Sequence, residues 1–125
     1  MTAAEFRRVA MSFSGVTEGV HMGHPDFRVS GKIFATLGYP TQGFATIMVS
    51  PFDQDLLLQS HPKAFAPAAG AWGSSGSTTV MLRVAPRHAV RLALEAAWKK
   101  RAPKPLVSDR AVSKSGRRRG GRDAV

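Results

Sequence analysis

Four polar residues that could do chemistry lie close together in one stretch of the chain. His21, His24 and Asp26 fall within six residues, and Arg28 follows two positions later. Imidazole and carboxylate groups at this spacing suit a metal ion or a polar ligand pocket. A zinc-type site needs three or four ligands, however, and the other two histidines belong to separate predicted elements. We therefore expect no metal, and keep the four residues as an alternative binding site for a small ligand or a protein on the open face of a sheet.

Support for an enzyme is weak. Ser74, Ser75 and Ser77 lie in the segment GAWGSSGS, which has no nucleophile-elbow motif. That segment leads into a predicted strand and contains no lysine, unlike a phosphate-binding loop. The chain has no cysteine, which excludes a thiolate nucleophile, a disulfide framework and cysteine-based metal centres. We expect no enzymatic activity, no catalytic residue and no cofactor.

A predicted β-hairpin offers two cations to a polyanion. Strand-like runs FRV and KIFAT flank Ser30-Gly31, and a two-residue loop with glycine is a strong hairpin signal. Arg28 and Lys32 would then lie on the two sides of the hairpin tip, a shape that can follow a phosphate backbone. Trp72, in the glycine-rich loop, could stack on bases or wedge between them. The structural alternative is that both cations are solvated sheet residues and that the indole caps the core.

The positive charge is concentrated at the C-terminal end of the chain. The net charge is +10, yet residues 1–98 hold eight Lys or Arg against six Asp or Glu, and residues 99–125 hold ten against two. Residues 108–125 are rich in Ser, Gly, Arg and Lys, which predicts a disordered basic tail. Counterion release would give its cations sequence-independent affinity for DNA. These tail residues are Lys114, Arg117, Arg118 and Arg119.

Three helices should flank the sheet. Thr2 and Glu5 have the spacing of a capping box before an amphipathic helix over residues 3–13. A serine followed by proline and an acid predicts a second helix over 51–60. Its apolar side chains are expected to be buried, namely Phe52, Leu56 and Leu57. Pro86 opens the last helix, whose apolar stripe is Val90, Ala93, Leu94, Ala97 and Trp98.

The sheet is predicted to be antiparallel and to pack on the first and last helices. It would contain the hairpin and the strands over residues 44–49 and 78–84, with residues 70–77 as a flexible loop between elements. The hairpin turn would pair Phe27 with Phe34. The predicted fold class is a single α+β domain over residues 1–107.

Nothing in the sequence suggests a membrane location. The N-terminal residues MTAAEFRRVAMSF have charges and lack the continuous apolar region of a signal peptide. No apolar run reaches the roughly 20 residues of a membrane span. We expect a cytoplasmic protein that is a monomer.

Several motifs in order along the chain resemble one family of small bacterial proteins. FRRVAMSFSGVTEG is followed by HMGHPDFRVSGKIFATL, then MVSPFDQDLLLQSHPKAFAPAAGAWG, then TTVMLRV, and finally an AW-containing helix that closes with AP. Together they resemble the MmcQ/YjbR family over residues 6–106. The resemblance implies a CyaY-like α+β fold and DNA binding through a double wing of β-hairpins. On this basis FRVSGKIFATL is one wing, and residues 72–77 with the next strand are the other.

Overall fold

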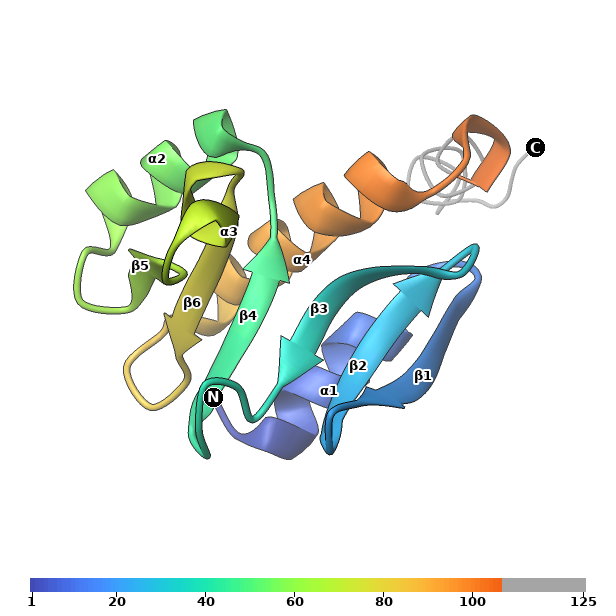
Figure 1. Cartoon of the computed structure of the whole chain (residues 1–125), viewed down its shortest axis with the longest axis horizontal. Coiled ribbons are helices and arrows are strands. Elements are labelled where there is room, and N and C mark those ends of the chain that lie inside the picture. The colour runs from blue at the N-terminus through green and yellow to red at the C-terminus, as the bar shows by residue number, and fades with distance from the viewer. Residues whose placement is uncertain (107–125) are drawn as a thin grey trace.

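A six-stranded sheet forms the framework of the protein in a computed structural model that describes residues 1–106 (Figure 1). The strands are all antiparallel, and their order across the sheet is β1-β2-β3-β4-β6-β5. The strands are β1 Val16–His21, β2 His24–Val29, β3 Lys32–Leu37, β4 Phe44–Met48, β5 Phe65–Pro67 and β6 Ser77–Met81. The helices are α1 Ala3–Met11, α2 Pro51–Ser60, α3 Ala71–Ser74 and α4 Arg87–Arg101. The predicted basic tail, with Lys114, Arg117, Arg118 and Arg119, lies outside the described residues.

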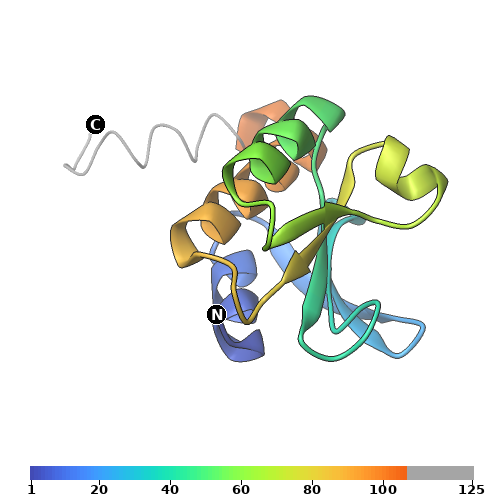
Figure 2. The same ribbon diagram turned by 90° about the vertical axis from the view of Figure 1, so that its left-hand side faces the viewer.

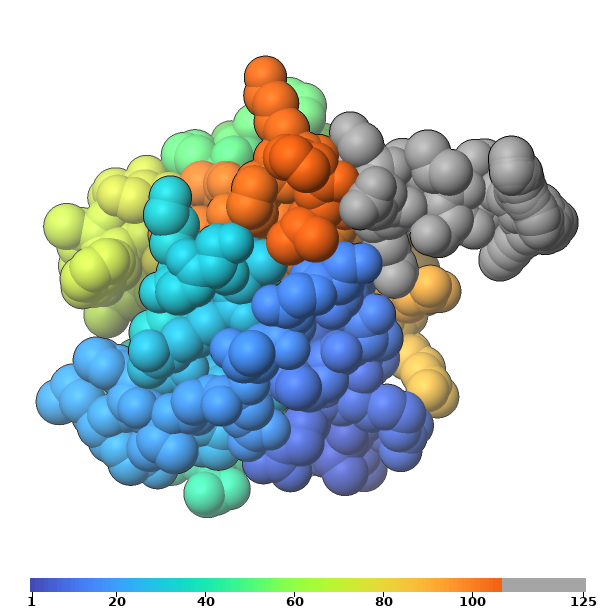
Figure 3. Space-filling model, turned by 90° about the vertical axis from the view of Figure 1, so that its right-hand side faces the viewer, coloured from blue at the N-terminus to red at the C-terminus, as the bar shows by residue number. Residues whose placement is uncertain are grey.

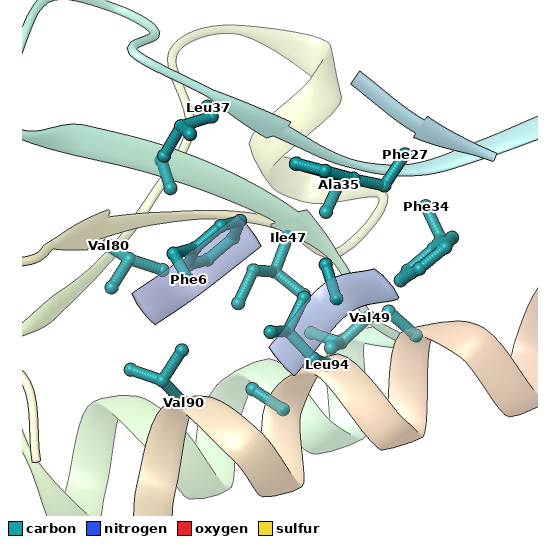
Figure 4. Close-up of a cluster of buried hydrophobic side chains, with 14 of the residues drawn as sticks. Phe6, Phe27, Phe34, Ala35, Leu37, Ile47, Val49, Val80, Val90 and Leu94 are labelled. Carbon is teal, nitrogen blue, oxygen red and sulfur yellow. The ribbon is translucent and has the colours of Figure 1, made fainter. Parts of the chain in front are cut away.

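Helices α1 and α4 cover one face of the sheet and leave the other face open (Figures 1 and 2). Residues of the α4 stripe are buried as the sequence predicts, and Figure 4 shows Val90 and Leu94 pointing toward Ile47 of the sheet. Trp98 joins α4 to the end of α1, because its ring stacks on Phe13 at 5.7 Å between centroids and its Nε1 donates to Ser14 O at 2.9 Å. The predicted α+β fold class is thus confirmed.

The N-terminal capping box forms as predicted. The Glu5 amide donates to Thr2 Oγ1 at 3.1 Å, and the Thr2 amide donates to Glu5 Oε1 at 2.8 Å. Each bond satisfies a backbone donor that the first helical turn leaves without a partner. Glu5 also pairs with Arg87 at the start of α4, so this cap connects the two helices behind the sheet.

The predicted pairing of Phe27 with Phe34 is wrong. The turn at Ser30-Gly31 does pair Val29 with Lys32, but further from the turn Phe27 pairs with Ala35. The register shifts beside Phe27 because β3 carries one extra residue, which is a β-bulge. The bulge lets Phe34 and its neighbour Ala35 both point into the core, where each is fully buried.

Helix α2 has its predicted bounds, but the predicted burial of its apolar residues is wrong for two of them. Phe52 is 72% exposed and Leu56 is 48% exposed, while Leu57 packs partly against the core. The buried residue is Gln54, at 7% exposure. A rotation that buries Gln54 points Phe52, two residues away, to the opposite side of the helix.

The segment before the last strand also differs from its prediction. Residues 70–77, expected as a flexible loop, contain the short helix α3 and the first residue of β6. Strand β6 ends at Met81, earlier than the predicted strand over 78–84, because the chain turns there: the Val84 and Ala85 amides both donate to Met81 O. No helix in the described residues is long and apolar enough to cross a membrane.

Candidate nucleic-acid interface

The hairpin between β2 and β3 exposes a cation at its tip. Ser30 and Gly31 both have positive φ, 51° and 77°, as the two-residue turn that matches strand twist requires. Lys32 follows directly and is exposed. Within residues 1–106 it forms no ion pair. Its ammonium group is therefore available to an external anion.

Arg28, the second predicted cation of this hairpin, has a protein partner. Its Nε donates to Asp26 Oδ1 at 2.7 Å and its Nη2 donates to Asp26 Oδ2 at 3.0 Å, which makes a bidentate pair. The Asp26 side chain is fully buried, and the Arg28 side chain is 36% exposed. The carboxylate raises the pKa of Arg28 by hydrogen bonding and by its charge. Two of the nitrogen atoms of this guanidinium are thus occupied by Asp26 and are not available to an external anion.

A glycine in the edge strand makes room for that ion pair. Gly19 of β1 lies opposite Asp26. A Cβ at this position would lie 2.9 Å from Asp26 Oδ1 and 3.1 Å from Arg28 Nε. Our sequence analysis missed Gly19, although an isolated glycine inside a strand often marks such a close approach.

The alternative ligand site is brought onto one face of the sheet. His24, Asp26 and Arg28 alternate along β2, and His21 pairs with His24 across the β1–β2 ladder. The His24 ring lies edge-on to Tyr39 at 5.4 Å, while Asp26 and Arg28 satisfy each other. Among the described residues no three His, Asp or Glu side chains gather closely enough for a metal ion. The role of these four residues in ligand binding stays a prediction.

Helix α3 presents an indole to solvent. Trp72 is 73% exposed on this four-residue helix. Buried Gln54 of α2 holds the segment from below, because its Nε2 donates to Gly73 O and Ser77 O at 3.0 Å each and to Thr78 Oγ1 at 3.3 Å. The indole therefore stands on a fixed support.

Two glycines fix the position of α3 further. A Cβ at Gly73 would collide with Ala68 O, and a Cβ at Gly76 would collide with Val49 O. Gly76 also has a φ of 108°, which side chains other than glycine rarely adopt. Sequence reasoning took the glycines of GAWGSSGS as a sign of flexibility, whereas here they allow close backbone packing.

The strand order places Lys32 and the helix that carries Trp72 at the same end of the strands, on opposite sides of the end of β4 (Figure 1). Strands β3 and β6 both run antiparallel to β4. The start of β3, the end of β4 and the start of β6 therefore lie at the same end of the strands. Lys32 opens β3, and α3 with Trp72 directly precedes β6. The C-terminal end of α4 reaches the same end of the strands, since Lys100 Nζ donates to Val49 O, directly after β4, at 3.3 Å.

We call this region the basic end and define it by five residues: Lys32, Trp72, Lys100, Arg101 and Lys104. None of its four cations forms an ion pair within residues 1–106. Figure 3 shows the cyan hairpin tip beside the orange last residues of the described chain. Leu106 and Val29 both approach the Cβ position of Gly15, at 3.0 and 3.8 Å, which brings the last described residue close to the hairpin.

The open sheet face continues from the basic end toward the opposite turns. In Figure 2, α3 projects at one end of this face, and the β1–β2 and β3–β4 turns project at the other. The β3–β4 turn carries Tyr39, which is exposed. The helix that carries Trp72 and the turn that carries Tyr39 thus lie at opposite ends of this face.

Comparisons with known proteins agree on the family. A model of the YjbR family matches residues 11–100. Among solved structures, the chain resembles the Deinococcus radiodurans protein DR2400, whose domain is described as DUF419. The TM-score is 0.68 at 19% sequence identity, over 98% of this chain and 96% of that one, a likeness that shows a shared fold. A search of curated proteins gave no match. With the family model spanning most of its length, this chain belongs to the YjbR family.

Proposed function

We propose that this protein binds DNA with little sequence preference, through the basic end and the adjoining open face of the sheet. The observation that carries the proposal is the exposed indole of Trp72 on helix α3, at the same end of the strands as cations that have no ion-pair partner in the described chain. The DNA binding implied by the family resemblance points to the same region, because the β2–β3 hairpin is the first predicted wing.

The rigid support under Trp72 distinguishes it from an ordinary surface residue. An exposed tryptophan leaves a large apolar area in water. Here Gln54 and two tightly packed glycines hold the backbone of α3, which carries the indole, against the rest of the protein. An aromatic ring on a rigid platform loses little conformational entropy when it stacks on a base, and every base has a face on which it can stack.

The four cations of the basic end would supply backbone contacts. Lysine and arginine side chains that neutralise phosphates release condensed counterions, which gives affinity without reading sequence. The tail cations predicted from sequence would add to this term. Arg28 is a weaker candidate than Lys32, since both oxygens of buried Asp26 already hold its guanidinium.

The test is a salt titration of oligonucleotide binding, followed by fluorescence anisotropy, with duplex and single-stranded 20-mers. We expect affinity to fall steeply with salt, and Lys32→Gln to lower the slope of log K against log salt by about 1. Trp72→Ala should weaken single-strand binding by roughly 1–3 kcal/mol if the indole stacks.

Lys63→Gln is the matched control. Lys63 is an exposed lysine between α2 and β5. The start of β5 pairs with the end of β6, so Lys63 lies at the opposite end of the strands from Lys32. Removing it changes the net charge by the same amount, so its salt slope should stay close to that of the wild type. Absence of binding at low salt, or equal slopes for both lysine variants, would count against the basic end as the contact surface.

A further inference from the structure

Large apolar side chains form an exposed strip on α2 and on the first half of α4. Phe52 and Leu56 lie one turn apart on α2, and Leu92 of α4 is 63% exposed. The sequence pattern predicts that the two α2 residues are buried, yet the described chain leaves both open to water. We call these three residues the apolar strip.

A groove lies between the two helices beside this strip. Leu56 and Leu92 line it from opposite sides, and its volume is about 270 Å³. The helices run antiparallel, since His61 after the end of α2 contacts His88 at the start of α4, with ring centroids 5.9 Å apart. Asp53, Ser60, His61 and His88 also line the groove, so the leucines are set among polar side chains between the two helices.

The exposed charges beside the strip have opposite signs on the two helices. Helix α2 holds Asp53 and Asp55 and no Lys or Arg. Helix α4 holds five Lys or Arg, but Arg87 pairs with Glu5, Lys99 pairs with Glu95, and Lys100 and Arg101 belong to the basic end, which leaves Arg91. Arg91 is exposed, and within residues 1–106 it forms no ion pair. Asp55 and Arg91 are both exposed and lie outside the groove, so one surface carries an acid on the α2 side and an arginine on the α4 side of Leu56 and Leu92.

From this arrangement we propose that the apolar strip is the interface of a symmetric dimer of this chain. A twofold axis parallel to the groove places α2 of one copy over α4 of the other, twice, so acidic and basic sides meet across the apolar centre. An axis perpendicular to the helices would instead set α4 against α4, where like charges repel. The surface is complementary to itself, which is the requirement for an isologous contact.

The proposed dimer leaves the nucleic-acid surface accessible. The strip uses Leu92 in the first half of α4, on the face of the sheet opposite the open one (Figures 1 and 2), whereas the basic end uses Lys100 and Arg101 in the last turn of that helix. The two proposals are therefore independent of each other, and either one can fail alone.

Sedimentation velocity of the full chain, from micromolar to several hundred micromolar protein, tests the proposal. We expect a concentration-dependent monomer–dimer equilibrium, and a loss of at least 10-fold in dimer affinity for Leu92→Glu, because a carboxylate would be buried in the contact. Val20→Glu is the control, since Val20 is also exposed but lies on β1 at the other edge of the sheet. Its equilibrium should match the wild type.

A charge exchange tests the arrangement of the helices. Asp55→Lys and Arg91→Glu should each weaken the dimer, and the double variant should regain affinity because opposite charges face each other again. Circular dichroism of every variant verifies that the fold is intact. A wild type that stays monomeric throughout, or single and double variants that dimerise equally, would overturn the proposal.

Discussion

Asp26 shows how one buried residue changes the role of its neighbour. A carboxylate without exposure to water needs a partner, because an unpaired buried charge is strongly unfavourable. Arg28 meets that need with two hydrogen bonds from its planar fork. From sequence, Asp26 and Arg28 were predicted to bind a ligand together, with Arg28 also a contact to nucleic acid, whereas their two-residue spacing on one strand makes them partners of each other first.

Gly19 provides a test of this close packing. Replacing a strand glycine with alanine usually stabilises a protein slightly, because glycine weakens strands by about 0.5–1 kcal/mol. Here the new Cβ would contact Asp26 Oδ1 and displace the ion pair. We expect Gly19→Ala to lower the free energy of unfolding by about 1 kcal/mol, as overpacking does. Urea denaturation measures it, and a stabilised variant would show that the pair moves aside without cost.

Glu5 provides a test of pH dependence at the first helical turn. Its bonds to Thr2, with Arg87 and the N-terminus nearby, lower its pKa from the ordinary value of 4.5. The unfolded state therefore binds the proton more readily, so the stability due to the Glu5 charge is present above pH 4.5 and is lost as the pH falls through the folded pKa.

Glu5→Gln isolates this charge, since glutamine can form the same capping box. We expect wild type to melt at a higher temperature than the variant at pH 7, and the difference to shrink below pH 4.5. Thermal melts from pH 3 to pH 7 measure it. A difference that is constant across this range would mean that the charge contributes nothing.

Among the elements, those with a clear period or cap were predictable from sequence. The α4 stripe is buried, the Thr2 capping box forms, α2 has its predicted bounds, and the turn at Ser30-Gly31 forms as predicted. The face of α2 that is buried was not predictable from hydrophobicity, because Gln54 is selected by backbone carbonyls of α3 and β6 that lie far along the chain. The bulge in β3 likewise reflects packing of Phe34 and has no local sequence signal.

Gln54 is the residue through which α2 holds α3. Its amide donates to three acceptors, and a leucine would remove these three bonds, although Gly73 O and Ser77 O each keep a backbone donor. We expect Gln54→Leu to cost about 2 kcal/mol in the free energy of unfolding, since a net hydrogen bond contributes about 1 kcal/mol. Gln59→Leu, at an exposed position of the same helix, should change stability by less than about 0.5 kcal/mol. Urea denaturation compares the two, and equal effects would remove Gln54 from its supporting role.

On the scale of the whole molecule, the order of the strands assembles the candidate site. Lys32 and Trp72 were chosen from sequence for their chemistry, but only the β3-β4-β6 order places Lys32 and the helix that carries Trp72 at the same end of the strands. The last turn of α4 joins them because that helix runs diagonally behind the sheet toward the same end (Figure 1). Sequence analysis assigned its cations to the C-terminal charge excess and did not place them beside the hairpin. Their role in DNA binding stays a prediction.

The two tryptophans lie in opposite environments. Trp98 is sealed between α1 and α4, and Trp72 is surrounded largely by water. Intrinsic fluorescence of the unmodified chain therefore has two separable sources: a blue-emitting one that a dissolved quencher such as acrylamide cannot reach, and a red-emitting one that it can. Loss of the first reports on unfolding, and protection of the second reports on whatever covers the indole, so the protein already carries its own optical probes for both.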